Sequence, residues 1–196
     1  LNTVTLPDVR MDVNGELAHG YMEIRYLLHE DLRKTLAVEA DAEKRFAEIF
    51  DRGGDPFLEP YRCDDADCVA VGLGSITYQL RVTVDALRKE GINVGVMGVR
   101  FYRPFPDAAI AKALKGKKGV IVFEKALSYG YEGALVSDLK SALYEHLAGT
   151  GHLPLVQNFI AGIGGREIRT DDLTQNFRAA IRNRIAKEPV WIGLKL

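Results

Sequence analysis

Residues 68–99, CVAVGLGSITYQLRVTVDALRKEGINVGVMGV, decide the fold class of this chain. An apolar run at 68–73 ends in a glycine turn and predicts a strand. A helix is expected next, because apolar residues recur at three- and four-residue steps before Gly91: Ile76, Leu80, Val84 and Leu87. Residues 92–99 are again largely apolar and predict a second strand. This order is typical of parallel strands joined by a crossover helix.

The same alternation continues toward the end of the chain. Further strands are expected at three apolar runs, the last of them as a closing edge strand: 120–124, 153–160 and 189–193. Helices are expected between them, at 109–114, 135–147 and 173–185. Strands that are apolar on both faces need helices on both faces. The sequence therefore predicts an α/β, three-layer domain with a mostly parallel sheet.

A different region precedes this domain. Residues 1–22 are rich in turn residues and are expected to form a connecting arm, and residues 23–50 predict one long helix. We therefore divide the chain into an arm and helix at 1–60 and an α/β domain at 61–196. The apolar stripe of the long helix either packs on its own domain or faces another domain or subunit.

Composition excludes several classes of protein. The chain has 26 basic and 27 acidic residues, so no extended cationic surface for nucleic acid or an anionic membrane is expected. No apolar run has the roughly 20 residues of a membrane-spanning helix, and the start does not resemble a signal peptide. Cys63 and Cys68 are too few for a zinc or iron–sulfur site and indicate reduced thiols in the cytoplasm. The chain begins at Leu1, which suggests a piece of a longer protein.

Two glycine-rich turns could bind ligands. The first, GLGSIT at 72–77, has half of a dinucleotide fingerprint, because Thr77 replaces its third glycine. It is either a nucleotide site or a tight turn that needs small residues. In the second, GIGGR at 162–166, the backbone amides of Gly164 and Gly165 could form an anion nest beside Arg166. An inter-domain contact is the other interpretation.

Two further segments follow predicted strands, where open α/β sheets place functional groups. Arg100 and Arg103 lie in RFYRPFP, residues 100–106, and either grip phosphate or carboxylate or belong to a rigid wedge against a neighbouring domain. Glu124 follows four apolar residues and is the best acid/base candidate, although a salt-bridged structural carboxylate is the alternative.

The residues do not indicate an active site in this chain. The four histidines lie away from the predicted strand ends, and no Gly-x-Ser-x-Gly motif occurs. We expect no catalytic, cofactor-binding or metal-binding residue here. From the residues alone, the chain is a folded module, and a stand-alone nucleotide- or anion-binding regulatory domain is an open alternative.

The order of these segments resembles a known family. A helix ending before Arg52, the turn at 72–77, the arginine loop at 100–106, Glu124 with the residues after it, and GIGGR at 162–166 succeed one another in the same order. Over residues 20–186 the chain is similar to the C-terminal part of the α subunit of 2-oxoacid:ferredoxin (acceptor) oxidoreductases of the pyruvate synthase type. Gly53–Gly54 replaces the single glycine common in that family.

The resemblance implies a transketolase C-terminal-like fold with a five-stranded, mostly parallel sheet and one antiparallel edge. It implies a non-catalytic domain in a cytoplasmic complex that decarboxylates a 2-oxoacid such as pyruvate to acyl-CoA. Thiamine diphosphate, magnesium and iron–sulfur clusters would lie elsewhere in that complex. The implied partners are the β and cluster-bearing subunits and, through the complex, ferredoxin or another acceptor. The same domain from a transketolase-like thiamine enzyme is an alternative.

Overall fold

The computed structural model describes residues 21–182 and 188–195. They fall into two units, one ending at Gly53 and one beginning at Gly54, and each is described by itself. The arm expected at residues 1–22 lies outside the described residues except for its last two positions. The same holds for residues 183–185 of the last predicted helix.

The first unit contains one long helix, α1 (Tyr21–Phe50), as the apolar spacing predicts. It ends at Asp51, whose φ of 51° leaves the helical region and whose amide still donates to the carbonyl of Ala47 at 3.0 Å. The rings of Phe46 and Phe50 lie 4.6 Å apart near this end. Residues 22–50 contain no buried side chain, so the helix has no core of its own.

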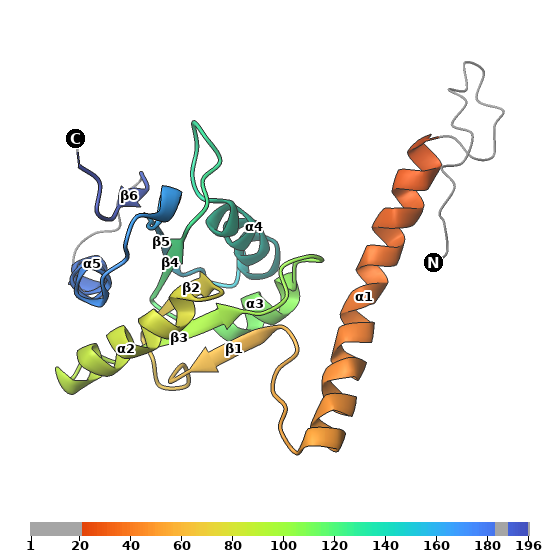
Figure 1. The fold of residues 1–196 in the computed structure, drawn as a ribbon, viewed down its shortest axis with the longest axis horizontal. Helices are drawn as coiled ribbons and strands as arrows, with labels where there is room; N and C mark the ends of the chain where they lie inside the picture. Colours follow the sequence, from red (N-terminus) through yellow and green to blue (C-terminus); the bar gives the residue numbers. More distant parts are fainter. Residues whose placement is uncertain (1–20, 183–187, 196) are drawn as a thin grey trace. The chain divides into compact units, whose positions relative to one another are not determined.

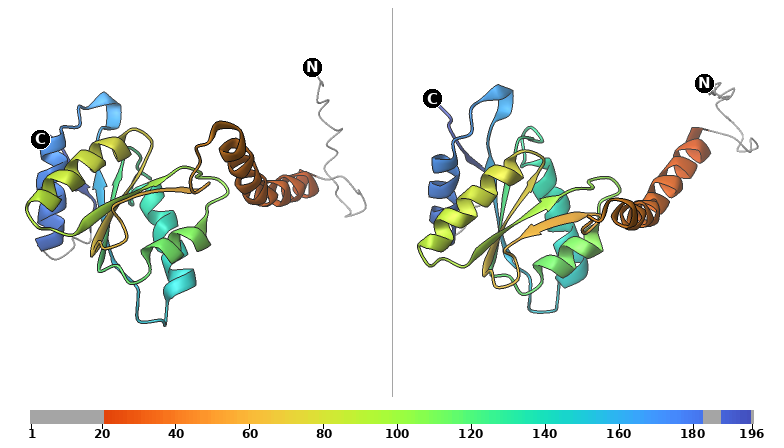
Figure 2. Two further views of the ribbon diagram at one scale, coloured as in Figure 1. Left: turned by 90° about the horizontal axis from the view of Figure 1, so that it is seen from below. Right: turned by 60° about the horizontal axis from the view of Figure 1, so that its bottom comes forward.

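The second unit is an α/β domain built on one six-stranded sheet (Figures 1 and 2). Its elements are, in chain order, β1 (Leu58–Tyr61), β2 (Cys68–Leu73), α2 (Ile76–Lys89), β3 (Val94–Val99), α3 (Asp107–Leu114), β4 (Gly119–Glu124), α4 (Ala134–Leu147), β5 (Leu155–Ile160), the 3-10 turn η1 (Ile163–Gly165), α5 (Thr170–Arg182) and β6 (Val190–Trp191). The strand order is β1-β3-β2-β4-β5-β6, and every pair is parallel except β1 with β3.

Two apolar cores lie between the sheet and the helices that pack on its two faces. Helices α2 and α5 cover one face and α3 and α4 the other, as Figure 2 shows. On the first face Phe123 stacks on Phe159 with ring centroids 5.0 Å apart, and Phe177 of α5 meets Phe123 edge-on. Strands β3 and β4 are buried at every position. The predicted three-layer, mostly parallel fold is confirmed.

The sheet has one strand more than the five expected. The additional strand, β1, forms the antiparallel edge, with Leu58 opposite Val99 and Tyr61 opposite Val96. It was missed because it has four residues, contains Pro60 and buries only Leu58, so that it lacks a strand's alternation. Its end crosses β3 closely, since a Cβ on Gly95 would lie 2.5 Å from the carbonyl oxygen of Arg62.

Candidate functional site

The residues predicted from the sequence lie at the carboxyl edge of the sheet. Parallel strands end at the same edge, and the register aligns Leu73 with Val99 and Glu124 with Ile160. The arginine loop therefore follows β3, and the GIGGR turn follows β5. Strands β2 and β4 lie between β3 and β5, which separates Arg103 from Arg166 along this edge.

The arginine loop is braced against its own domain. The Arg100 guanidinium donates to the carbonyl of Asp55 at 2.7 Å, and its amide donates to the carbonyl of Phe57 at 2.8 Å. Arg100 therefore ties the loop to the segment that enters β1.

Arg103 connects the same loop to α4. Its guanidinium donates to Asp138 Oδ2 at 2.6 Å and stacks 4.1 Å from the ring centre of Tyr102. The Tyr102 hydroxyl donates to the same carboxylate oxygen at 2.7 Å, and the pKa of Tyr102 is raised by burial and by this bond. The Tyr102 ring also meets Phe105 edge-on at 5.8 Å. The Arg103 side chain still keeps about half of its surface, 55%, in solvent.

Glu124 is almost completely buried, with 3% of its surface exposed. Its carboxylate accepts hydrogen bonds from the amides of Leu135 and Val136 at 2.8 and 3.2 Å, at the start of α4. Asn158 on β5 donates to it at 2.8 Å. Burial raises the pKa of the Glu124 carboxyl despite these three donors. The partners of the Glu124 carboxyl group are therefore helix amides and an asparagine, and not a cation. The carboxyl group caps the N-terminus of α4.

Gly133 makes this arrangement possible. A Cβ built on Gly133 would lie 1.8 Å from Glu124 Oε1, a distance that no side chain tolerates. The Gly133 amide itself donates to Asn158 Oδ1 at 3.1 Å. Only glycine at this position lets a buried carboxylate reach the first amides of α4.

The first glycine turn links two neighbouring strand ends. Gly74 has a left-handed φ of 63°, and the Ser75 side chain makes no capping bond to α2. Lys125, which follows β4, donates to the Ser75 hydroxyl at 3.2 Å. Thr77 is buried against Gly98 instead of facing an open turn. These contacts favour the interpretation of a tight structural turn.

The GIGGR turn leaves its polar groups in solvent. Gly162, Gly164 and Gly165 have left-handed φ values of 72°, 66° and 79°, and the amide of Arg166 closes the turn on Ile163. Gly164, Gly165 and Arg166 are exposed and line one hollow. Of the predicted site residues, these three lie together.

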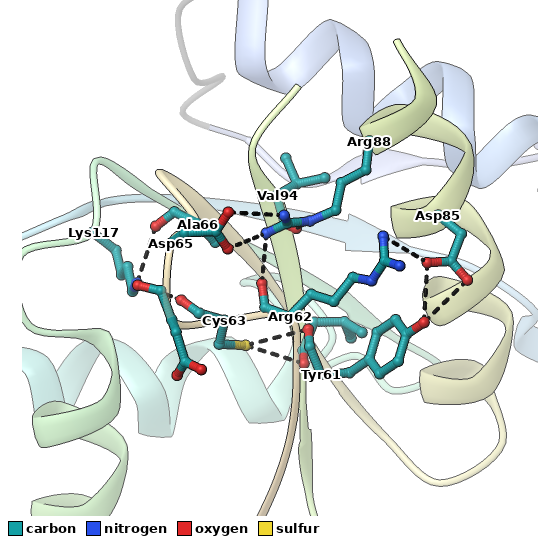
Figure 3. Close-up of polar contacts among 11 residues, drawn as sticks. Tyr61, Arg62, Cys63, Asp65, Ala66, Asp85, Arg88, Val94 and Lys117 are labelled. Atoms are coloured by element: carbon teal, nitrogen blue, oxygen red, sulfur yellow. Dashed lines mark hydrogen bonds and ion pairs between the residues drawn. The ribbon is translucent and has the colours of Figure 1, made fainter. Parts of the chain in front are cut away.

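Sequence reasoning missed a polar network beside the opposite, amino end of the strands (Figure 3). The Lys117 ammonium donates to the carbonyls of Cys63, Asp64 and Ala66 at 2.6, 3.3 and 3.0 Å. The network holds the segment that joins β1 to β2. No sequence signal could have found it, because backbone carbonyls carry no residue identity.

Arg88 of α2 adds a second clamp on the same segment. It donates to the carbonyls of Arg62 and Val94 at 2.9 and 2.7 Å and to both oxygens of Asp65. Cys63, within the clamped segment, donates weakly to the carbonyl of Val96 at 3.3 Å. Cys63 and Cys68 are free thiols whose pKa values are raised by burial, so they are poor nucleophiles.

Residues 21–182 and 188–195 contain neither a grouped set of metal ligands nor a membrane-spanning helix. In this part of the chain no three His, Cys, Asp or Glu side chains are grouped to hold a metal ion. No helix within the same ranges has the length and apolarity to cross a bilayer.

The chain is similar to domains and subunits of known oxidoreductases. Residues 66–173 match the family described as pyruvate:ferredoxin oxidoreductase core domain II. The chain is 37% identical to pyruvate synthase subunit PorA of Thermotoga maritima, over 92% of this chain and 45% of the relative. It is 34% identical to ketoisovalerate oxidoreductase subunit VorA of Pyrococcus abyssi, over 89% of this chain and 44% of the relative. The chain thus spans less than half the length of these relatives.

Proposed function

The chain belongs to the pyruvate:ferredoxin oxidoreductase core domain II family, and on that premise we propose that it is a non-catalytic, inter-subunit domain of a 2-oxoacid oxidoreductase. The complex would decarboxylate a 2-oxoacid such as pyruvate to acyl-CoA and pass electrons to ferredoxin or another acceptor. Similarity to subunits named for pyruvate synthase and ketoisovalerate oxidoreductase supports this reaction class.

The proposal places the complex's cofactors outside this chain. Thiamine diphosphate, magnesium and iron–sulfur clusters belong to other parts of the subunit or to the β and cluster-bearing subunits. In this proposal the domain presents a docking surface to the other domains and subunits of the complex. A cytoplasmic location is part of the proposal, and the two free thiols support it.

The observation that carries the inter-subunit role is the set of groups exposed at the carboxyl edge. The loop after β4 presents Tyr129 and Tyr131, which are 89% and 69% exposed. The loop is closed at its base by the Ser128 amide, which donates to the carbonyl of Glu132 at 2.9 Å. Arg103 lies at the same edge on its braced loop. Tyrosine and arginine are the residue types enriched where proteins dock.

The test compares assembly with domain stability. The chain would be co-expressed with the remaining parts of its subunit and the other subunits, and assembly followed by size-exclusion chromatography and 2-oxoacid-dependent ferredoxin reduction. We expect Y129A/Y131A and R103A to weaken assembly. The Tm of the chain alone should change little, because exposed rings and an exposed ion pair contribute only about 0–1 kcal/mol.

Asp138→Ala is the control for Arg103. It removes the ion pair that braces the loop, together with the Tyr102 bond to the same oxygen, but leaves the guanidinium in place. Assembly that is weakened by R103A and kept by D138A supports docking through Arg103. Equal effects of both changes would mean that Arg103 acts only as an internal brace. Normal assembly of R103A and Y129A/Y131A together would overturn the inter-subunit role of this edge.

A further inference from the structure

A hollow of ≈ 640 Å³ lies at the carboxyl end of β5, beside the start of α5. It is lined by the η1 turn, Arg166, Glu167, Arg169, Asp172, Gly193 and Lys195. A narrower, mainly apolar slot of ≈ 140 Å³ adjoins it and is bordered by Trp191, Ile192 and Leu194. The two spaces share Ile163, Arg166 and Gly193, so they form one continuous depression with a polar part and an apolar part.

The polar part carries cations that have no partner. The side chains of Arg166, Arg169 and Lys195 make no hydrogen bond or ion pair with any residue that the structure describes. Six other arginines of the domain are paired, as Arg178 is with Glu90 at 2.5 Å. Glu167 and Asp172 also line the hollow, so three cations and two carboxylates leave one formal positive charge. This local excess contrasts with a net charge of −1 for the chain.

The exposed backbone of the η1 turn lines the same hollow. Gly164 and Gly165 are both exposed, and the Gly165 amide takes part in the 3-10 turn. The left-handed φ values of both glycines and the closing bond from Arg166 to Ile163 make a compact turn that places Arg166 at the hollow. Guanidinium groups supply the paired donors that suit phosphate oxygens.

We propose that this depression binds a small phosphate ester whose flat apolar group lies against Trp191. Phosphate oxygens would accept from the Arg166 and Arg169 guanidinium groups, with the glycine turn and Lys195 beside them. The apolar slot would take a flat ring, because Trp191 is 41% exposed beside it. A nucleoside polyphosphate has both parts. The proposal concerns a ligand of this domain and does not depend on the assembly proposed above.

The chain itself offers the probe, because Trp191 is its only tryptophan. Titrations of the 196-residue chain with inorganic pyrophosphate, inorganic triphosphate, ATP and adenosine would be followed by tryptophan fluorescence and repeated by calorimetry. We expect ATP to bind with a Kd on the order of 0.1–1 mM and more tightly than inorganic triphosphate. Binding should weaken as salt is added, since the charges are exposed.

The variant R166A/R169A is expected to weaken the binding of both ATP and pyrophosphate by about tenfold or more. The matched control, K112A/K115A, removes two exposed cations from α3 and the turn after it and should leave the affinity unchanged. Equal loss in both variants would mean only a general charge effect and would overturn the site. No saturation by pyrophosphate or ATP up to about 10 mM would overturn it as well.

The apolar slot beside Trp191 is tested separately. If ATP binds no more tightly than inorganic triphosphate and leaves Trp191 emission unchanged, the ring is not held at Trp191 and that half of the proposal is wrong. Failure of either arm leaves the assembly test untouched, because that test uses Arg103 and the tyrosine loop.

Discussion

The surroundings of Glu124 favour a structural role over the acid/base role that its sequence position suggests. Its position after four apolar residues suggests acid/base chemistry, yet its oxygens are occupied by the first amides of α4 and by Asn158. The pKa of Glu124 is raised from 4.5, mainly because burial disfavours the charged carboxylate. The folded state therefore binds its proton more tightly than the unfolded state. This contribution to stability is complete below pH 4.5 and is lost as the pH rises through the folded pKa.

Replacing Glu124 with Gln should test this account. The variant turns an NH₂ group toward amide donors, and we expect the free energy of unfolding to fall by about 1–3 kcal/mol. The difference between the two proteins should be largest near pH 4 and should shrink toward pH 7, because the variant has no proton to lose. Urea unfolding across that range measures it, with the exposed Glu145→Gln as control. A difference that grows with pH would show that the amides hold the anion.

At the scale of secondary-structure elements, the side chains of Lys117 and Arg88 hold the segment between β1 and β2. Lys117 and Arg88 donate to four backbone carbonyls of this segment, which has little regular structure: those of Arg62, Cys63, Asp64 and Ala66. Arg88 also donates to the carbonyl of Val94 on β3. The segment contains Arg62 at an unfavourable φ of 53°. The clamps therefore hold the antiparallel edge strand in its register.

Lys117→Met should loosen this segment more than its surface position suggests. Three carbonyls lose their donor, and the expected cost is about 1–3 kcal/mol in the free energy of unfolding. Hydrogen exchange at residues 62–67 should become faster in the variant, while exchange in β4 and β5 should change little. Lys115→Met, an exposed neighbour, is the control and should have neither effect. Unchanged exchange in the segment would contradict the clamp.

Helix α1 leaves a row of apolar side chains exposed, including Leu28 and Leu32. Apolar surface of this extent favours association in water. We expect the chain to self-associate at high concentration and L28E/L32E to reduce that association. Ala37→Glu adds a charge half a turn away around the helix and is the control. Sedimentation velocity measures the outcome, and a chain that stays monomeric at all concentrations would refute the expectation.

Among residues 21–182 and 188–195, every member of the two apolar cores comes from the second unit. The cores begin in sequence at Phe57 and Leu58, and none of their members belongs to α1. A protein of residues 54–196 should therefore fold cooperatively, with a free energy of unfolding within about 1 kcal/mol of the full chain. Urea unfolding of the two proteins compares them. A much less stable fragment would show that α1 packs on the sheet.

The sequence by itself determined the fold class. Largely apolar runs at β2, β3, β4 and β5 need cover on both faces, and the helical stripes between them supply it, so local pattern and global fold agree. The long helix and the ends of most elements followed from the same periodicities. The order of the glycine, arginine and glutamate segments also carried the family resemblance, because order along the chain needs no coordinates.

Only the tertiary structure decided which contacts the candidate site residues make. The sequence places Arg103 and Arg166 after strands of one sheet, but strand order sets β2 and β4 between them. The sequence shows Glu124 and Gly133 nine residues apart, but packing alone brings the carboxylate to the space that a Cβ would fill. Strand β1 and the Lys117 clamp depend on backbone groups paired across the fold. Such contacts have no residue pattern, because any amide or carbonyl can make them.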